Sequence, residues 1–225
     1  MRVVAAIILA TAAAIVPAGA SELPAPLSKA IAAEAPWADF RASFSMRATA
    51  PDAAQALVLH YDAPGDAWTV LEGDLDRLDE ETRTAISAMQ EELTEPGELT
   101  YHDMKDDLNG AVLDEETADS LIYHLDINHE DSDMPKKMRE AIRPLLFVNK
   151  ADGTVSRFSV SLTEPVKPAA IARIDDMTIE QDFAPLPDGP TVLRRYYNKI
   201  TGNAMFQDFS EEFTLEFFDF VPLAQ

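Results

Sequence analysis

Histidines and oxygen-bearing side chains gather in one stretch of the sequence, where their spacing is close to that of a metal site. The stretch holds His124, Asp126, Asn128, His129, Glu130, Asp131 and Asp133. Its centre resembles the start of a calcium-binding loop, but the sixth position needs glycine for a sharp turn and is Asp131 here. The terminal glutamate of such a loop is displaced to Glu140. The pattern favours a solvated acidic loop over a metal site, and we predict no metal and no cofactor.

Motifs for enzymatic chemistry are absent from the sequence. It contains no nucleophile elbow, no zinc-binding HExxH and no phosphate-binding loop. Adjacent carboxylates occur at 80–81, 91–92 and 115–116, in polar runs that are typical of solvated helix faces. General acid–base catalysis needs carboxyl groups placed on either side of a substrate, and spacing alone does not provide that. We therefore predict that the protein is not an enzyme.

Aromatic residues crowd the C-terminal stretch EEFTLEFFDFVPLAQ. Phe213, Leu215 and Phe217 alternate with polar residues, as on a strand with one apolar face. From Phe217 to Val221 the alternation breaks, and apolar residues fall on both faces. A strand that is turned into a sheet corner or covered by helices can be apolar on both sides. The residues are compatible with ordinary core packing and with a face that binds an apolar ligand.

The N-terminal stretch MRVVAAIILATAAAIVPAGA has the anatomy of an export signal. A basic residue, Arg2, precedes an apolar run, and Ala18-Gly19-Ala20 forms a small-residue cleavage pattern. The run is shorter than the roughly 20 residues that a membrane-spanning helix needs. We expect residues 1–20 to be a signal peptide, 21–225 to form a single domain, and the mature protein to be periplasmic and not membrane-spanning.

Charge and cysteine content narrow the classes of partner. The chain has a formal net charge of −22, and loss of Arg2 would bring it to −23. Nucleic-acid binding needs clustered basic residues, which the sequence lacks. No cysteine is present, so a disulfide framework and a lipid-anchored cysteine are excluded. One explanation of the negative charge is that self-repulsion keeps the protein soluble. Alternatively, segment 73–133 of this chain forms an acidic surface that binds a basic partner.

Hydrophobic periodicity predicts a chain of mostly antiparallel strands with three helices. Strands joined by short hairpins indicate an antiparallel sheet. The segment 97–120 is interpreted as an irregular or short helical connection. We expect turns at 64–66, 152–153, 201–203 and near 210. The predicted helices are 21–36, 76–95 and 134–146, and the predicted strands lie in 40–48, 57–61, 68–71, 121–127, 147–162, 171–183 and 191–220.

The order of these elements resembles that of the periplasmic carriers of outer-membrane lipoproteins, the LolA-like family. The likeness covers most of residues 27–221: an N-terminal helix, the strand FRASFSMRA, a hairpin ending in Trp68, an interruption, and a run of meandering strands after the Pro-Val-Lys-Pro connection at 165–168. Family members carry an arginine–proline element before the tryptophan strand, whereas residues 60–68 contain Pro64 but no arginine. The resemblance implies a curved sheet that forms an incomplete barrel, with a concave face that receives acyl chains.

We predict an α+β fold in which a curved antiparallel β-sheet forms an incomplete barrel covered by helices. The expected function is that of a periplasmic carrier or binding protein for an acylated or otherwise apolar ligand, such as a lipoprotein or lipid. The alternative is an interaction or sensor module that binds a basic partner through its acidic surface. The residues expected to line the ligand site are Phe40, Phe44, Met46, Leu57, Leu59, Trp68 and Val70.

Overall fold

One large antiparallel sheet dominates the computed structural model. The structure describes residues 23–223 apart from 52–55, 79, 103, 105–107, 109, 126–134, 170 and 206. The expected signal peptide, the histidine at 129 and most of the acidic loop around it therefore lie outside the described residues. Within the described part, no helix is long and apolar enough to cross a membrane.

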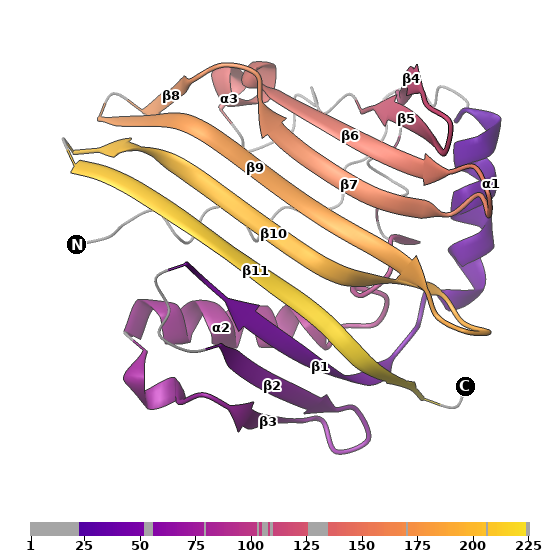
Figure 1. The fold of residues 1–225 in the computed structure, drawn as a ribbon, viewed down its shortest axis with the longest axis horizontal. Coiled ribbons are helices and arrows are strands. Elements are labelled where there is room, and N and C mark those ends of the chain that lie inside the picture. The colour runs from indigo at the N-terminus through magenta and orange to yellow at the C-terminus, as the bar shows by residue number, and fades with distance from the viewer. Residues whose placement is uncertain are drawn as a thin grey trace.

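The sheet is open, and most of its neighbouring strands are consecutive in the chain. Its order is β3-β2-β1-β11-β10-β9-β7-β6-β5-β4, with β8 paired to β9, and every pairing is antiparallel. The first strand, β1, lies beside the last, β11, in the interior of the sheet (Figure 1). The strands are β1 Ala42–Thr49, β2 Leu57–Asp62, β3 Ala67–Glu72, β4 Val112–Glu116, β5 Ser120–His124, β6 Ile142–Asn149, β7 Val155–Leu162, β8 Val166–Ala169, β9 Ala172–Pro185, β10 Thr191–Ala204 and β11 Gln207–Pro222.

In the described residues three helices accompany the sheet, which makes the fold α+β. They are α1 Ala25–Glu34, α2 Glu80–Leu93 and α3 Lys136–Ala141, and the 3-10 turns η1 Ala35–Trp37 and η2 Leu75–Arg77 adjoin the first two. Pro26 lies in the first turn of α1, where its fixed φ suits the helix and its missing N–H costs no hydrogen bond. In Figure 1, α2 lies behind β1 and β2, and α1 stands beside the ends of β6 and β7.

The sheet has an apolar inner face and a polar outer face. Leu27 of α1, Met89 of α2 and Phe44 of β1 belong to one buried cluster, so the inner face is the one that packs toward these helices. A second cluster joins α3, β8, β9 and β10 on Met138, Ala141, Ile142, Val166, Ile174, Met177 and Ile200. A third, smaller cluster holds Phe40, Ala42 and Val192. Burial of these side chains is the main source of stability in a chain without disulfides.

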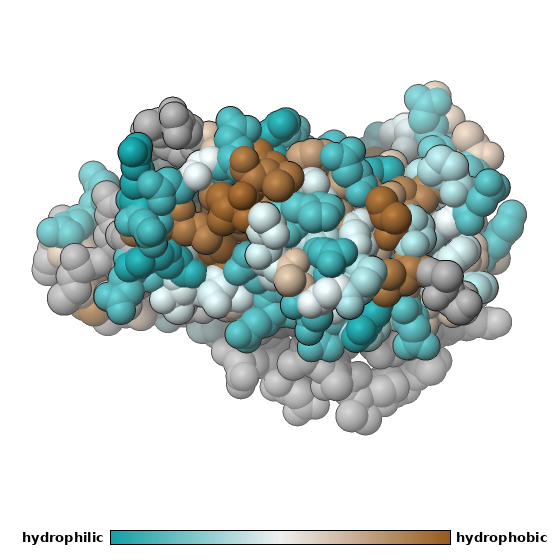
Figure 2. Space-filling view, turned by 90° about the horizontal axis from the view of Figure 1, so that it is seen from below, coloured by the Kyte–Doolittle hydropathy of each residue, from teal (hydrophilic) through white to brown (hydrophobic). Residues whose placement is uncertain are grey.

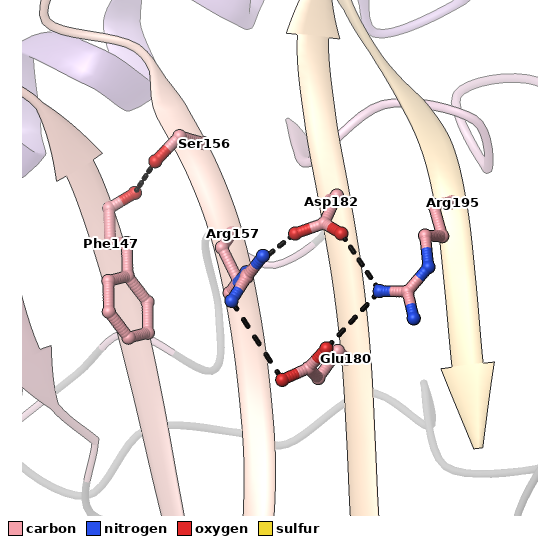
Figure 3. A network of polar contacts seen from close by, with 6 residues as sticks. All are labelled: Phe147, Ser156, Arg157, Glu180, Asp182 and Arg195. Atoms are coloured by element: carbon pink, nitrogen blue, oxygen red, sulfur yellow. Dashed lines mark hydrogen bonds and ion pairs between the residues drawn. The ribbon is translucent and has the colours of Figure 1, made fainter.

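A four-residue ionic network joins three central strands on the outer face (Figure 3). Asp182 of β9 accepts hydrogen bonds from Arg157 of β7 and from Arg195 of β10, the latter at 3.1 Å. Glu180 lies on the same face, 3.2 Å from Arg195 and 3.8 Å from Arg157. Because the four groups are partly exposed, we assign them a role in strand register and solubility more than in stability.

Helix α1 is anchored to β10 through a buried carboxylate. Glu34 is 3% exposed, and its Oε1 accepts a hydrogen bond of 3.0 Å from the backbone N–H of Thr191. Tyr101 donates from its phenol to the carbonyl of Ala30 on the same helix. Burial, reinforced by the negative charge of Glu34, raises the pKa of the Tyr101 phenol above its ordinary value. These contacts fix the N-terminal helix to the sheet.

Several predicted elements are confirmed. Helices 21–36 and 76–95 correspond to α1 and α2, and the hairpins that turn at 64–66 and 152–153 are β2–β3 and β6–β7. The α+β class and the antiparallel sheet are also confirmed. In each case the local pattern and the turn residues agree with the final packing.

The predicted helix 134–146 is wrong beyond its first turns. Only Lys136–Ala141 is helical, and Ile142 begins strand β6. Pro144 is the reason: the residue before a proline is disfavoured in the helical region, so Arg143 takes an extended conformation. Likewise, the predicted irregular connection 97–120 contains the edge strand β4, whose five residues are all exposed and therefore show no alternation.

The predicted turns at 201–203 and near 210 are also wrong. β10 continues to Ala204, the reversal falls at Met205, whose φ is +51°, and β11 runs through Ser210. Gly202 serves close packing instead of a turn, because a Cβ there would meet the carbonyl of Arg173 and the ring of Phe209. A bulge in β9 at this point brings the two strands together.

A bulge in β11 explains the aromatic crowding at the C-terminus. Between the pairs Ser43–Val221 and Ser45–Phe218, β11 has one residue more than β1, and Asp219 has a φ of +54°. This extra residue reverses the alternation. Phe217 and Phe220 consequently both contact Phe44, with ring centroids at 6.0 and 5.9 Å, although three positions separate them.

Candidate functional site

Six of the seven residues predicted to line a ligand site share the inner face of β1, β2 and β3. Direct cross-strand pairs are Met46–Leu59 and Leu59–Val70, and Trp68 lies opposite Tyr61. Phe40 precedes β1 and belongs to the small third cluster. The members of the inner-face group are Phe44, Met46, Leu57, Leu59, Trp68 and Val70.

This part of the inner face is closely packed. Phe44 is 0% exposed and contacts four rings, with centroid distances of 5.5 Å to Trp68 and 5.7 Å to Tyr61. Phe217 and Phe220 are the other two rings in contact with Phe44. Edge-to-face and tilted arrangements of this kind stabilise an aromatic cluster beyond the burial of area. In this conformation the group around Phe44 is a filled core.

The packing loosens toward the edge strand β3. Trp68 is half-buried, and its indole Nε1 is buried without a hydrogen-bond partner. Val70, two residues further along the same face, is 39% exposed. The neighbouring Leu71 points to the other face and is 59% exposed. The edge therefore presents apolar side chains on both faces.

The centre of the inner face carries a second apolar area, which we call the central strip. Cross-strand register places Val160 opposite Ile179 and, one row away, Tyr196 opposite Leu215. Its apolar side chains are half-buried, whereas Phe44 and Met46 are fully buried. The strip lies between the main cluster and the second cluster, and its apolar members are Phe158, Val160, Ile179, Tyr196 and Phe213.

Two carboxamides interrupt the central strip. Asn198 of β10 lies opposite Ile179 on one side and Phe213 on the other, and it is 7% exposed. Gln181 lies opposite Tyr196, one row from Asn198. The side-chain oxygen of each is buried and has no hydrogen-bond partner. Sequence reasoning missed both residues, although an amide between Tyr196 and Ile200 at a spacing of two was a visible break in an apolar face.

A phenol and a carboxylate border the strip. Burial, together with the charge of Glu92 on α2, raises the pKa of Tyr196 to about 12, so the phenol stays neutral and can donate a hydrogen bond at physiological pH. Burial also raises the pKa of Glu92 above its usual range. These shifts indicate a poorly hydrated environment where α2 approaches the strip.

A surface pocket of about 380 Å³ opens between α3 and β8. Ala141 and Val166 line it and also belong to the second cluster. Its rim carries Lys137, Lys167 and Arg173, together with Glu140 and Glu164, so cationic and anionic groups are mixed there. Arg173 forms an ion pair with Asp175 at 2.7 Å, and Glu140 pairs with Lys136.

The described residues offer no assembled metal or catalytic centre. Over the described parts of 23–223, no three His, Cys, Asp or Glu side chains come together in a way that could hold a metal ion. Ser45 Oγ lies 3.1 Å from His60 Nδ1 on the outer face, but Ser45 is buried. Glu115 and Glu116 are exposed on β4. The question of a metal at His129 and its acidic neighbours falls outside the described residues.

Comparisons of the chain with models of protein families, with curated proteins and with solved structures found no match. The case for a function therefore rests on the geometry of the inner face.

Proposed function

We propose that the protein is a carrier or binding protein that holds an apolar or acylated ligand against the inner face of its sheet. The observation that carries the proposal is the central strip, where Val160, Ile179 and Phe213 are only partly buried on the apolar face. A fully packed sheet would bury such side chains, since exposed apolar area costs about 25 cal/mol per Å². A ligand chain lying on the strip would remove that area from water.

The fold is compatible with the LolA-like architecture implied by the order of elements. In this proposal the open sheet is an incomplete barrel, α1 and α2 cover part of its inner face, and the ligand is an acyl chain of a lipoprotein or lipid. Each buried methylene contributes about 0.8 kcal/mol, so a chain of about twelve carbons contributes roughly 10 kcal/mol before the entropic costs of binding. Binding of this kind needs no catalytic group and no cofactor.

Trp68 and Val70 of β3 offer the ligand a second contact area. Both residues lie on the inner face, and neither is fully buried. Displacement of side chains around Phe44 would be needed for a ligand to reach the remaining predicted lining residues. We therefore place the primary contact on the central strip and the extension at the β3 edge.

Native mass spectrometry of the protein purified from the periplasm tests this function directly. We expect a mature chain that begins at Ser21 and carries a lipid or acylated peptide as additional mass. Recovery of a chain that retains residues 1–20 would contradict the proposed periplasmic location. A ligand-free chain that also fails to bind a fluorescent acyl probe would contradict the carrier proposal.

A matched pair of variants localises the ligand. Ile179→Gln places an amide on the inner face of β9, and Thr178→Gln places the same side chain on the outer face one residue away. The first should weaken binding of a fluorescent acyl probe at least tenfold, and the second should leave it within about twofold. Equal effects would show that the probe does not lie on the inner face.

A second candidate function, binding of a basic partner, is favoured by the β3 edge. β3 is an outermost strand, and Val70 and Leu71 are exposed on it, next to the exposed carboxylates of Glu72, Asp74 and Asp76. Figure 2 views the side of the molecule on which β3 lies and shows apolar surface bordered by hydrophilic side chains. An extended basic segment could add a strand there. Part of the acidic segment 73–133 lies outside the described residues.

Salt dependence separates this alternative from the carrier function. A partner held by the β3 edge should be lost from a pull-down as salt rises from 50 to about 500 mM, because charge pairs are screened. Leu71→Lys should abolish the interaction without changing acyl-probe affinity. Retention of the partner by this variant would contradict docking at β3.

A further inference from the structure

Asn198 is a polar side chain enclosed by the apolar part of the inner face. Its cross-strand neighbours are Ile179 and Phe213, and its same-face neighbours on β10 are Tyr196 and Ile200. The residue is 7% exposed, and its Oδ1 has no hydrogen-bond partner. An unpaired buried acceptor is costly, which is why native proteins rarely retain one without a partner.

Gln181 repeats the feature one row away. It lies opposite Tyr196, so it is the diagonal neighbour of Asn198 across the β9–β10 pair. Diagonal neighbours in an antiparallel pair are about 7–8 Å apart at the backbone, within reach of one polar group placed between their side chains. Its Oε1 is also buried and unpartnered. The two unpartnered carboxamide oxygens therefore belong to diagonal neighbours in the strip.

We infer that Asn198 and Gln181 recognise a hydrogen-bond donor on the ligand, so the ligand class is an acyl chain that carries an N–H or O–H group, as in an N-acyl amide or a hydroxylated chain. This inference rests on the proposed function. An apolar chain alone leaves both oxygens unpaired, whereas a chain with a donor pairs them in a poorly hydrated site, where such a bond discriminates strongly. The partly buried side chains of Ile179 and Phe213 are the ones that would turn aside to admit it.

Among the described residues, no side chain donates a hydrogen bond to the amide oxygen of Asn198 or of Gln181. Glu92 is an acceptor when ionised, and the Tyr196 phenol forms no hydrogen bond with either amide in this structure. Arg195 and Tyr197, which flank Tyr196 in sequence, point to the outer face, where they contact Asp182 and Glu212. A bound molecule that carries a donor would satisfy both amide oxygens.

The test compares two probes of equal chain length in competition with a fluorescent acyl probe. Decanamide has two N–H donors, and methyl decanoate has none. The measured quantity is the ratio of their affinities, because this ratio in wild type and in a variant cancels the different hydration of the two probes. Replacing Asn198 by Leu keeps the number and branching of the side-chain heavy atoms and removes the amide oxygen. We expect the decanamide preference to fall about tenfold in Asn198→Leu, with methyl decanoate affinity retained.

A second variant and a matched control complete the design. Gln181→Met lies at a less buried position and should lower the same ratio, which keeps the inference testable if Asn198→Leu does not fold. Asn203→Leu is the same change on the same strand, but the Asn203 amide already donates to Asp208 at 3.0 Å. It should leave the ratio unchanged. 1-Decanol, with a single O–H, tells whether a hydroxyl serves as well as an amide.

Each outcome decides between the two proposals. If wild type binds both probes and the ratio is the same within twofold in Asn198→Leu or Gln181→Met, the amides contact water instead of ligand and the inference is overturned, while the carrier function stands. If wild type binds neither probe, the carrier function falls and the inference falls with it. A tenfold loss of the decanamide preference that is absent in Asn203→Leu supports the inference.

Discussion

Truncation of Phe44 measures whether the inner face of β1 is a filled core. Phe44 is 0% exposed, and Tyr61, Trp68, Phe217 and Phe220 surround it with ring centroids at 5.5 to 6.0 Å. Removing an aromatic ring from a filled core costs about 3–5 kcal/mol, and each aromatic pair adds about 0.5–1.5 kcal/mol beyond buried area. Because four rings lose a partner, we expect Phe44→Ala to lose about 4–5 kcal/mol of unfolding free energy.

Phe218→Ala is the matched control for this measurement. Phe218 is half-buried on the opposite face, where Arg47 lies 5.3 Å from the centre of its ring. The loss there should be about 1–2 kcal/mol, from partial burial and the cation–π contact. Urea denaturation of wild type and both variants, followed by circular dichroism and tryptophan fluorescence, gives the three free energies.

The result that would refute the reasoning is a Phe44→Ala loss no larger than that of Phe218→Ala, with an unchanged denaturant dependence. Phe44 would then border empty space or a bound ligand in solution, and the primary ligand contact would extend from the central strip onto β1. A loss near 4 kcal/mol with unchanged acyl-probe affinity would keep the ligand on the central strip.

Three further predictions concern carboxylates. Glu34→Ala leaves the buried N–H of Thr191 without an acceptor and should cost about 1–3 kcal/mol by urea denaturation, whereas Glu34→Gln, which keeps a carbonyl oxygen, should cost less. Burial raises the pKa of Glu92 in the folded protein. The contribution of Glu92 to stability is therefore fully present below the ordinary carboxyl pKa of 4.5, where Glu92 is protonated. That contribution is lost as pH rises through the folded-state pKa and the buried carboxyl group ionises. Glu92→Gln should therefore raise Tm at pH 7 and leave it nearly unchanged at pH 4, and an equal Tm change at both pH values would contradict this. Glu115 and Glu116 are exposed on β4, and changing both to Gln should alter unfolding free energy by no more than about 0.5 kcal/mol, so that a loss of several kcal/mol would indicate a bound cation.

Much of the fold was predictable because local pattern and packing agree over most of the chain. The alternation from Phe40 to Ala48 indicated a strand with one apolar face, and five of those residues are buried in a row from Ala42 to Met46. The strand β4 was not predictable by alternation, since an exposed edge strand has no buried face to impose it. Strand β6 carried a usable signal in Pro144, which outweighs the helical spacing of its apolar residues.

The candidate site was only partly predictable. Alternation correctly placed Phe44, Met46 and Leu59 on a common face, because side chains two residues apart point the same way. The central strip is different, since its members come from four strands that are spread between 158 and 213. Nothing in the local sequence says that Asn198 will lie between Ile179 and Phe213, because register between distant strands is set by the packing of the whole sheet.

The sequence by itself determined which side chains are apolar, where helices α1 and α2 form, where two hairpins turn, and that no cysteine or basic cluster is available for other chemistry. Tertiary structure decided which apolar side chains are fully buried and which are only partly buried. It also decided, through the extra residue at Asp219, that Phe217 and Phe220 share one face. The physical reason is range: propensity and alternation act over a few residues, whereas bulges, register and burial depend on strands brought together from distant parts of the chain.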